Sequence, residues 1–183
     1  MAVYLGNNQV DILGGIEITN LYHFPNGTQW TQSNITSNIF NCVYYANGIW
    51  VAGSGNNKGL YYSTDGKTWT QSNIIGSTFN CVYYANGIWV AGSGNNEGLY
   101  YSTDGKTWFQ TDTSSGNFKC VYYANGIWVT GAANGLYSSK DGKIWFQTDT
   151  SSGNFKCVYN ANGIWVTGAD NDGLYYSVTW ELV

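Results

Sequence analysis

A block of about 39 residues recurs along this chain and limits the folds that it can adopt. The string "CVYYANGIWVAGS" occupies residues 42–54 and 81–93, and close variants occupy 120–132 and 157–169. The steps from Trp30 to Trp69, Trp108 and Trp145 are 39, 39 and 37 residues. A period of this length is typical of proteins that stack one small structural unit several times.

Each block predicts two β-hairpins. In the first, "CVYYA" and "IWVAGS" flank Asn47-Gly48, a dipeptide that tolerates the positive φ angles of a type I′ turn. In the second, "GLYYS" and "TWTQS" flank Asp65-Gly66-Lys67. One block is therefore expected to form a four-stranded antiparallel sheet.

Side-chain alternation along these strands predicts a sheet that is apolar on both faces. One face is expected to carry Val43, Tyr45 and Trp50, and the other Cys42, Tyr44 and Val51. Such a sheet needs a neighbour on each side, which a radial stack of sheets in a β-propeller provides.

The less regular ends of the chain set the predicted number of blades. "AVYLGNNQVDILG" (2–14) aligns with "CVYYANGIWVAGS", with Asn7-Asn8 in place of the Asn-Gly turn, and "LYHFPNGTQW" (21–30) aligns with "LYYSTDGKTW". "LYYSVTW" (174–180) keeps the strands but lacks the Asp-Gly-Lys turn. We expect a single domain, residues 1–183, that forms an all-β, five-bladed β-propeller of four-stranded antiparallel blades. The predicted blades are approximately 2–40, 41–79, 80–118, 119–155 and 156–183.

A four-bladed ring with an N-terminal arm is the alternative. In the five-bladed ring, closure depends on side-chain packing between the first and last blades. Assembly between chains stays open, because repeats also permit it.

The four cysteines, Cys42, Cys81, Cys120 and Cys157, occupy one equivalent position in successive blocks. Stacked sheets lie about 10 Å apart, beyond the roughly 7 Å limit between the Cα atoms of a disulfide. We therefore predict small, buried, free thiols, which suit a reducing compartment.

Charge and composition exclude some partners. The net charge is -4 and the chain contains no Arg, so it cannot assemble the concentrated positive surface that nucleic acid requires. "MAVYLGNNQV" has neither the charged start nor the apolar run of a secretory signal peptide. We expect cytoplasmic synthesis and no membrane insertion.

A second motif, "STDGKTW" (63–69 and 102–108), returns as "SKDGKIW" (139–145). It resembles the Asp box of bacterial neuraminidase repeats, shortened by one residue. That resemblance implies a turn between the third and fourth strands of propeller blades, distant from any active centre. The Asp side chains can accept backbone hydrogen bonds and the Trp side chains can anchor the turn by burial. The structural residues predicted here are Ser63, Asp65, Trp69, Ser102, Asp104, Trp108, Ser139, Asp141 and Trp145.

Enzymatic activity is not expected. Sialidases hold the substrate carboxylate with a cluster of Arg, and a Lys point charge does not replace a bidentate guanidinium. The single histidine, His23, aligns with Tyr62 and is interpreted as a packing residue. Glycoside hydrolysis by two carboxylates needs no Arg and stays the open alternative. The sequence "DND" (170–172) is interpreted as a solvated turn, so no metal or cofactor is predicted.

The repeats serve as controls for one another and indicate a binding face. The connection between the second and third strands reads "SGNNKG", "SGNNEG", "AANG" and "ADNDG", and the connection between blades changes from "QSNIIGSTFN" to "QTDTSSGNFK". In an up-and-down blade these two connections share one rim, where a rigid scaffold presents recognition loops. Neutral variation of exposed loops is the alternative. The predicted binding residues are Asn56, Asn57, Lys58, Asn95, Asn96, Glu97, Asp112, Asn134, Asp149, Asp170, Asn171 and Asp172.

Amide and hydroxyl groups beside Tyr61 and Tyr100 suit hydroxylated ligands. We therefore expect a lectin-like, multivalent module that recognises a glycan or a cell-surface receptor. The alternative is a structural or protein-interaction ring within a larger assembly. "MAVYLGNNQV" resembles the start of small tail-associated proteins of phages and prophages of Gram-positive bacteria, which implies a place in a virion or tail.

Overall fold

The computed structural model describes residues 2–5, 8–11, 31–36, 38–149, 153–170 and 172–178. The chain divides into two units, residues 1–32 and 33–183. In the first unit, β1 (Ala2–Leu5) and β2 (Asn8–Asp11) form an antiparallel hairpin. Leu5 pairs with Asn8, so Asn8 belongs to the strand and the predicted Asn7-Asn8 turn is wrong by one residue. Gly6 also tolerates a hairpin turn, so the sequence offered two registers.

The described part of the second unit contains four antiparallel sheets, each with its strands in sequence order. We name these sheets blades I to IV. Blade I comprises β3 (Phe40–Ala46), β4 (Ile49–Ser54), β5 (Leu60–Ser63) and β6 (Thr70–Gln71). Blade II comprises β7 (Phe79–Ala85), β8 (Ile88–Ser93), β9 (Leu99–Ser102) and β10 (Phe109–Gln110).

Blade III comprises β11 (Phe118–Ala124), β12 (Ile127–Ala132), β13 (Gly135–Ser139) and β14 (Phe146–Asp149). Blade IV has three strands in the described part of the chain, β15 (Phe155–Ala161), β16 (Ile164–Ala169) and β17 (Gly173–Ser177). The all-β propeller architecture is confirmed. The count of five blades stays a prediction, because "LYHFPNGTQW" and residues 179–183 lie outside the described residues.

The Asn-Gly turns have the predicted left-handed conformation. Asn47 has φ of 50° and Gly48 has φ of 76°, and the same dipeptide has positive φ at both residues in all four blades. These angles favour Asn and Gly over other residues. The local sequence therefore sets the register of the first hairpin of each blade.

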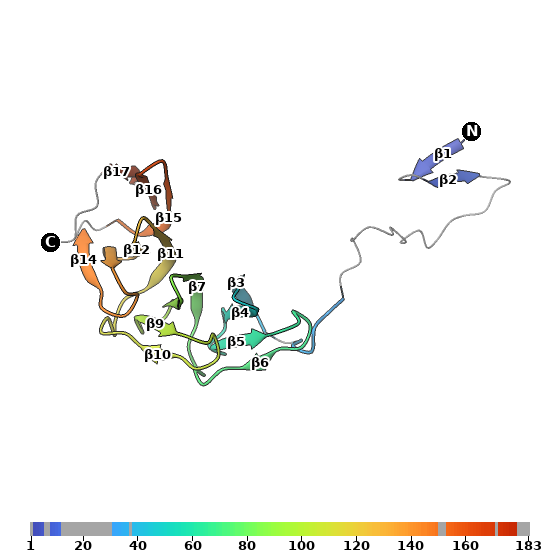
Figure 1. The fold of residues 1–183 in the computed structure, drawn as a ribbon, viewed down its shortest axis with the longest axis horizontal. Helices are drawn as coiled ribbons and strands as arrows, with labels where there is room; N and C mark the ends of the chain where they lie inside the picture. Colours follow the sequence, from blue (N-terminus) through green and yellow to red (C-terminus); the bar gives the residue numbers. More distant parts are fainter. Residues whose placement is uncertain are drawn as a thin grey trace. The chain divides into compact units, whose positions relative to one another are not determined.

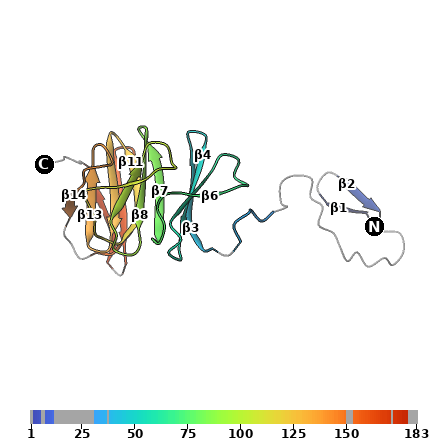
Figure 2. The ribbon, with the colours of Figure 1, turned by 90° about the horizontal axis from the view of Figure 1, so that it is seen from below.

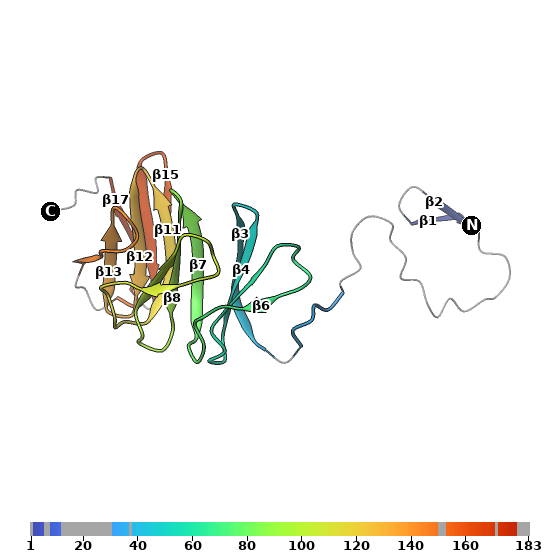
Figure 3. The same ribbon diagram turned by 60° about the horizontal axis from the view of Figure 1, so that its bottom comes forward.

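The first strands of the blades line the inside of the unit formed by residues 33–178. Strands β3, β7, β11 and β15 are successive neighbours, while β6, β10 and β14 lie at the periphery (Figure 1). Figures 2 and 3 show the long strands of neighbouring blades standing side by side. Tyr44, Tyr83, Tyr122 and Tyr159 form a ladder along the inner strands, with successive ring centroids 4.8, 5.2 and 4.7 Å apart.

Blades I and II enclose one hydrophobic core, and blades II and III enclose another. We name the face of a blade that is directed toward the next blade in the chain its leading face, and the opposite face its trailing face. Val51 and Leu60 on the leading face of blade I pack with Phe79, Trp89 and Trp108 on the trailing face of blade II. The same arrangement recurs between blades II and III, where the corresponding residues are Val90, Leu99, Phe118, Trp128 and Trp145. The predicted division of the side chains between two faces is confirmed.

Polar clamps reinforce these cores at the backbone of the box tryptophans. Asn73 accepts a hydrogen bond from the Trp108 N–H (2.8 Å) and donates one to the Trp108 carbonyl (2.9 Å). Asn34 makes the same two bonds with Trp69, at 2.8 and 3.0 Å. Residues 33–36 therefore occupy the place that the end of a preceding blade takes elsewhere in the unit.

All four cysteines are free thiols, as predicted. Cys81 is buried, and burial raises the pKa of Cys42 to about 12. The prediction of burial is wrong for Cys157, which is exposed, and holds only in part for Cys42 and Cys120, which are half-buried. Cys157 lies on the leading face of blade IV, and no further blade among residues 33–178 covers this face.

Candidate functional site

The up-and-down course of the strands divides the connections between two rims. We name as box rim the Asn-Gly turns together with the turns at residues 64–68, 103–107 and 140–144. We name as loop rim the connections at 55–59, 94–98, 133–134 and 170–172, together with the connections between blades. Hydrogen bonds link the loop-rim connections to one another, for example from the Gly59 N–H to the Ser77 carbonyl (2.8 Å).

The box rim repeats one set of hydrogen bonds three times. In blade II, Ser102 Oγ accepts from the Gly105 N–H (2.9 Å) and donates to Asp104 Oδ1 (2.9 Å). Asp104 Oδ1 also accepts from the Lys106 and Thr107 N–H groups, both at 2.8 Å. The indole of Trp108 donates to the Gly105 carbonyl at 3.2 Å. The same groups bond alike around Asp65 and Asp141.

These hydrogen bonds favour the ionised carboxylates. The N–H groups of Thr68 and Lys67, followed by the Ser63 hydroxyl, lower the pKa of Asp65 from 3.8 to about 2. Burial opposes the shift at Asp104 and Asp141, but the corresponding bonds outweigh it and lower the pKa of both. A carboxyl group held ionised in this way cannot deliver a proton near neutral pH.

The loop rim of blades I and II has a shared framework that presents amide side chains. Buried Ser54 accepts hydrogen bonds from the Asn56 and Lys58 N–H groups, both at 3.2 Å, and donates to Asn56 Oδ1 at 2.7 Å. Asn57 has φ of 59° and exchanges hydrogen bonds with Thr78 of the adjoining connection, at 2.7 and 3.2 Å.

Blade II repeats much of this framework. Ser93 Oγ accepts from the Asn95 N–H at 3.2 Å, and Asn95 Nδ2 donates to Asn57 Oδ1 of the blade before it. Asn96 has φ of 64°, and its Oδ1 accepts from the Gly116 N–H at 2.8 Å. Four predicted binding residues, Asn56, Asn57, Asn95 and Asn96, are thus gathered at one edge of the loop rim.

Two buried acceptors on the loop rim have no hydrogen-bond partner among the described residues. They are Glu97 Oε2 in the connection of blade II and Asn154 Oδ1 in the connection that leads into blade IV. Buried polar atoms are generally paired. Three further buried polar atoms without a partner, the donors Trp128 Nε1 and Asn160 Nδ2 and the hydroxyl Ser138 Oγ, belong to strands.

Charged groups replace amides in the last two blades. Lys156 Nζ lies 2.7 Å from Asp170 Oδ2, which also accepts from Asn154 Nδ2 at 3.1 Å. Asp172 accepts a hydrogen bond from the Tyr175 hydroxyl. Burial, and then the charge of Lys156, lower the pKa of Lys119.

The remaining predicted binding residues are dispersed. Asn134 donates to the Tyr137 hydroxyl at 2.9 Å. Asp112 accepts from the Trp145 N–H at 3.1 Å, in the position of the Asn73 clamp. Lys58 is exposed. Asn171 and the side chain of Asp149 lie outside the described residues.

The sequence reasoning missed the residue that precedes each cysteine. Asn41 Nδ2 donates to the Phe79 carbonyl (3.2 Å) and to Asn80 Oδ1 (3.3 Å), and Asn80 Nδ2 donates to the Phe118 carbonyl (2.8 Å). Lys119 and Lys156 stand at this position in blades III and IV. The signal was the change from Asn to Lys at one fixed place in the repeat.

The two rims thus have different chemistry. In the box rim the Ser, Asp and Trp side chains bond within their own turns and the lysines, such as Lys67, are exposed, whereas the loop rim presents exposed amides, charges of both signs and two unpaired acceptors. No group of three or more His, Cys, Asp or Glu suited to a metal ion occurs among the described residues. The described part of the chain also contains no helix that is long and apolar enough to cross a membrane.

Comparisons with known proteins show the fold. No protein-family profile matches the sequence, and no curated protein sequence matches it. The computationally designed Ika4 protein matches with a TM-score of 0.64 and 15% identity, over 82% of this chain and 98% of that chain. An ancestral GH74 enzyme matches with a TM-score of 0.62 and 16% identity, over 77% and 23%.

YCF48 from Cyanidioschyzon merolae matches with a TM-score of 0.59 and 13% identity, over 76% of this chain and 53% of that chain. The chain therefore spans about half of YCF48 and under a quarter of the GH74 enzyme. The GH74 enzyme and YCF48 are β-propellers, in agreement with the sheets described above.

Proposed function

We propose that this protein is a non-enzymatic recognition module whose loop rim binds hydroxyl-rich ligands such as glycans. The observation that carries the proposal is the pair of unpaired buried acceptors, Glu97 Oε2 and Asn154 Oδ1, on the rim whose side chains vary between blades. A buried acceptor without a donor is costly, and ligand hydroxyl groups would supply donors.

The exposed amides of Asn57, Asn95 and Asn96 add both donors and acceptors beside Glu97. Amide groups can pair with a hydroxyl in either direction. Because several blades present such loops, weak sites can combine on a ligand that spans them. A glycan-coated cell surface is a ligand of this kind.

The absence of catalysis is part of the proposal. The box carboxylates are held ionised by backbone N–H groups, and Asp112 and Asp170 are engaged with Trp145 and Lys156. A place in a phage or prophage tail is also proposed, supported by the resemblance of "MAVYLGNNQV" to tail-associated proteins. Turnover in a screen of glycoside substrates would contradict the non-enzymatic assignment.

The test is a glycan array followed by titration calorimetry with a glycan that binds. Glu97→Ala and Lys58→Ala change the loop rim, and Lys67→Ala is the matched control because Lys67 is exposed on the box rim. We expect the loop-rim changes to weaken binding about tenfold, the equivalent of about 1.4 kcal/mol, and the control to bind as the wild type does. Equal binding by all variants, or no binding to any glycan, would overturn the proposal.

A further inference from the structure

Blades I and IV, the first and last of the four described blades, expose apolar faces. The equivalent faces of blades II and III are buried. Phe40 on the trailing face of blade I is 39% exposed, whereas its equivalents Phe79, Phe118 and Phe155 are 0% exposed. Val43 is 57% exposed and its equivalent Val82 is 7% exposed. The repeats have the same residues at these positions, so the difference comes from the lack of a neighbouring blade on this side among residues 33–178.

The leading face of blade IV shows the same contrast. Leu174 is 78% exposed, whereas Leu60 and Leu99 are 0% exposed. Val166 is 41% exposed, whereas Val51, Val90 and Val129 are 0% exposed. Tyr159, Ile164 and Tyr176 add further exposed apolar surface on β15, β16 and β17. Contiguous apolar surface of this kind marks an interaction site.

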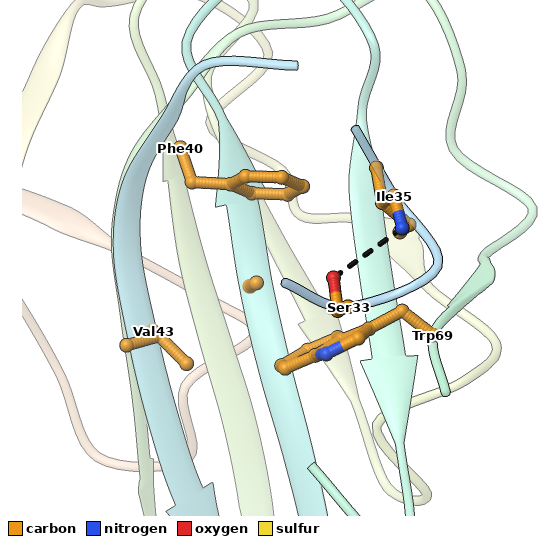
Figure 4. A pocket seen from close by; sticks show the side chains of 6 residues that line it. Ser33, Ile35, Phe40, Val43 and Trp69 are labelled. Atoms are coloured by element: carbon orange, nitrogen blue, oxygen red, sulfur yellow. Dashed lines mark hydrogen bonds between the residues drawn. The ribbon is translucent and has the colours of Figure 1, made fainter. Parts of the chain in front are cut away.

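The exposed face of blade I is hollowed. A pocket of about 200 Å³ is lined by Ser33, Ile35, Phe40, Val43, Ala52 and Trp69. Figure 4 shows the rings of Phe40 and Trp69 bordering this hollow, with Ser33 accepting a hydrogen bond from the Ile35 N–H. The same bond joins Ser72 to Ile74 in blade I (3.1 Å). At this face residues 33–36 therefore stand where the end of a connection between blades stands elsewhere in the unit.

The two end faces are complementary halves of one interface. The leading face of blade IV carries Cys157, Tyr159, Ile164, Val166 and Leu174, as blade I carries Cys42, Tyr44, Ile49, Val51 and Leu60. The trailing face of blade I carries Phe40, Val43, Trp50, Ala52, Tyr61 and Trp69, as blade II carries Phe79, Val82, Trp89, Ala91, Tyr100 and Trp108. These two residue sets already pack against each other inside the unit.

The exposed face of blade I also keeps one part of a joint between blades. Residues 33–36 are the end of a connection between blades, and Asn34 clamps them to Trp69 as Asn73 clamps Trp108.

We propose that the chain assembles head to tail, with the leading face of blade IV of one copy packed on the trailing face of blade I of a second copy. Interior blades are joined by rigid, close-packed cores, which resist the bending needed to bring the two ends of one copy together. A contact between two different faces forms a closed ring when its rotation closes. The smallest such ring is a dimer, which contains this interface twice.

The test is the mass of the full-length protein by sedimentation velocity and native mass spectrometry. We expect a closed oligomer, a dimer of twice 20.2 kDa in its smallest form. Leu174→Glu and Val43→Glu should each shift the protein to monomer and weaken association at least 100-fold. Ile144→Glu is the matched control, because Ile144 is an exposed apolar residue of the box rim and should leave the mass unchanged.

Mixing the two monomeric variants gives the decisive result. A pair made of one Leu174→Glu copy and one Val43→Glu copy retains one interface in which both faces are wild type, so oligomers should return. Cys157 should also lose its reactivity toward maleimide in the wild-type oligomer and regain it in the Val43→Glu monomer. Circular dichroism of each variant shows whether it is folded.

Three outcomes would overturn the proposal. A wild-type protein that is monomeric at all concentrations would mean that the faces are covered within one chain, as in a five-bladed ring. Oligomers that survive both substitutions would use another surface. Folded monomeric variants that do not associate on mixing would exclude an interface between two different faces.

Discussion

The box rim and the loop rim are built on the same strands, yet the hydrogen bonds of the box rim recur from blade to blade and those of the loop rim change. The box rim repeats the same hydrogen bonds around Asp65, Asp104 and Asp141. On the loop rim Asn57 bonds Thr78, whereas Asp170 bonds Lys156. The comparison teaches that the Ser and Asp side chains that close a turn are kept unchanged between blades. Exposed side chains of the loop rim can vary without altering the strands that carry them.

The largest expected effect belongs to the box rim. Trp108 is buried in the core between blades I and II, and its indole donates to the Gly105 carbonyl. Trp108→Ala should lower the free energy of unfolding by about 4 kcal/mol because it leaves a large cavity. Urea denaturation followed by tryptophan fluorescence measures it. A loss below about 1 kcal/mol would show that the box tryptophan is no anchor.

Gly98 tests whether the backbone of the loop rim tolerates change as its side chains do. Gly98 has φ of 83°, and a Cβ there would lie 1.9 Å from the Thr113 carbonyl oxygen. Gly98→Ala should therefore cost about 3 kcal/mol, since strain and collision combine. Denaturation by urea should show a lower midpoint. An unchanged midpoint would mean that the connection can move aside, and that the rim is less rigid than the strands.

The box carboxylates give the next effect. Asp104→Ala removes the acceptor of the Lys106 and Thr107 N–H groups and of the Ser102 hydroxyl. We expect a loss of about 2 kcal/mol, the size typical of hydrogen bonds to a charged group. Asp104→Asn, which keeps one acceptor oxygen, should lose less. Equal losses in the two variants would assign the effect to packing instead.

Acid should act through the same groups. The pKa of Asp65 in the folded state is about 2, below the ordinary 3.8, and the pKa values of Asp104 and Asp141 are also lowered. The folded state then binds fewer protons than the unfolded state, so this stabilisation is complete above about pH 4 and is lost as pH falls toward about 2. Thermal unfolding between pH 6 and pH 2 measures the loss. Replacing all three residues by Asn should make the melting temperature depend less on pH. An unchanged pH dependence would show that other groups titrate in this range.

The smallest effect is expected for an exposed amide of the loop rim. Asn95→Ala removes one hydrogen bond to Asn57 and leaves the backbone framework intact. The free energy of unfolding should change by less than about 0.5 kcal/mol. A loss comparable to that of Asp104→Ala would remove the distinction between the two rims.

The strands, the turns and the division of side chains between two faces could be predicted from sequence, because each depends on residues that are near one another in the chain. Asn47-Gly48 sets its own turn, and Val51 and Trp50 alternate within one strand. The clamps at Asn34 and Asn73 could not be predicted, since each acts on a tryptophan 35 residues further on. The exposure of Phe40 and Leu174 was missed for another reason, because it depends on what lies beside the blade.

The repeated core between blades has a consequence for how such a chain can change in evolution. Every blade offers the same surface to the blade after it, as Val51 and Val90 do. A gene that gained or lost one whole repeat would therefore create no mismatched joint, and the arc would simply grow or shrink by one sheet. Only the gap between the first and the last blade would change in width.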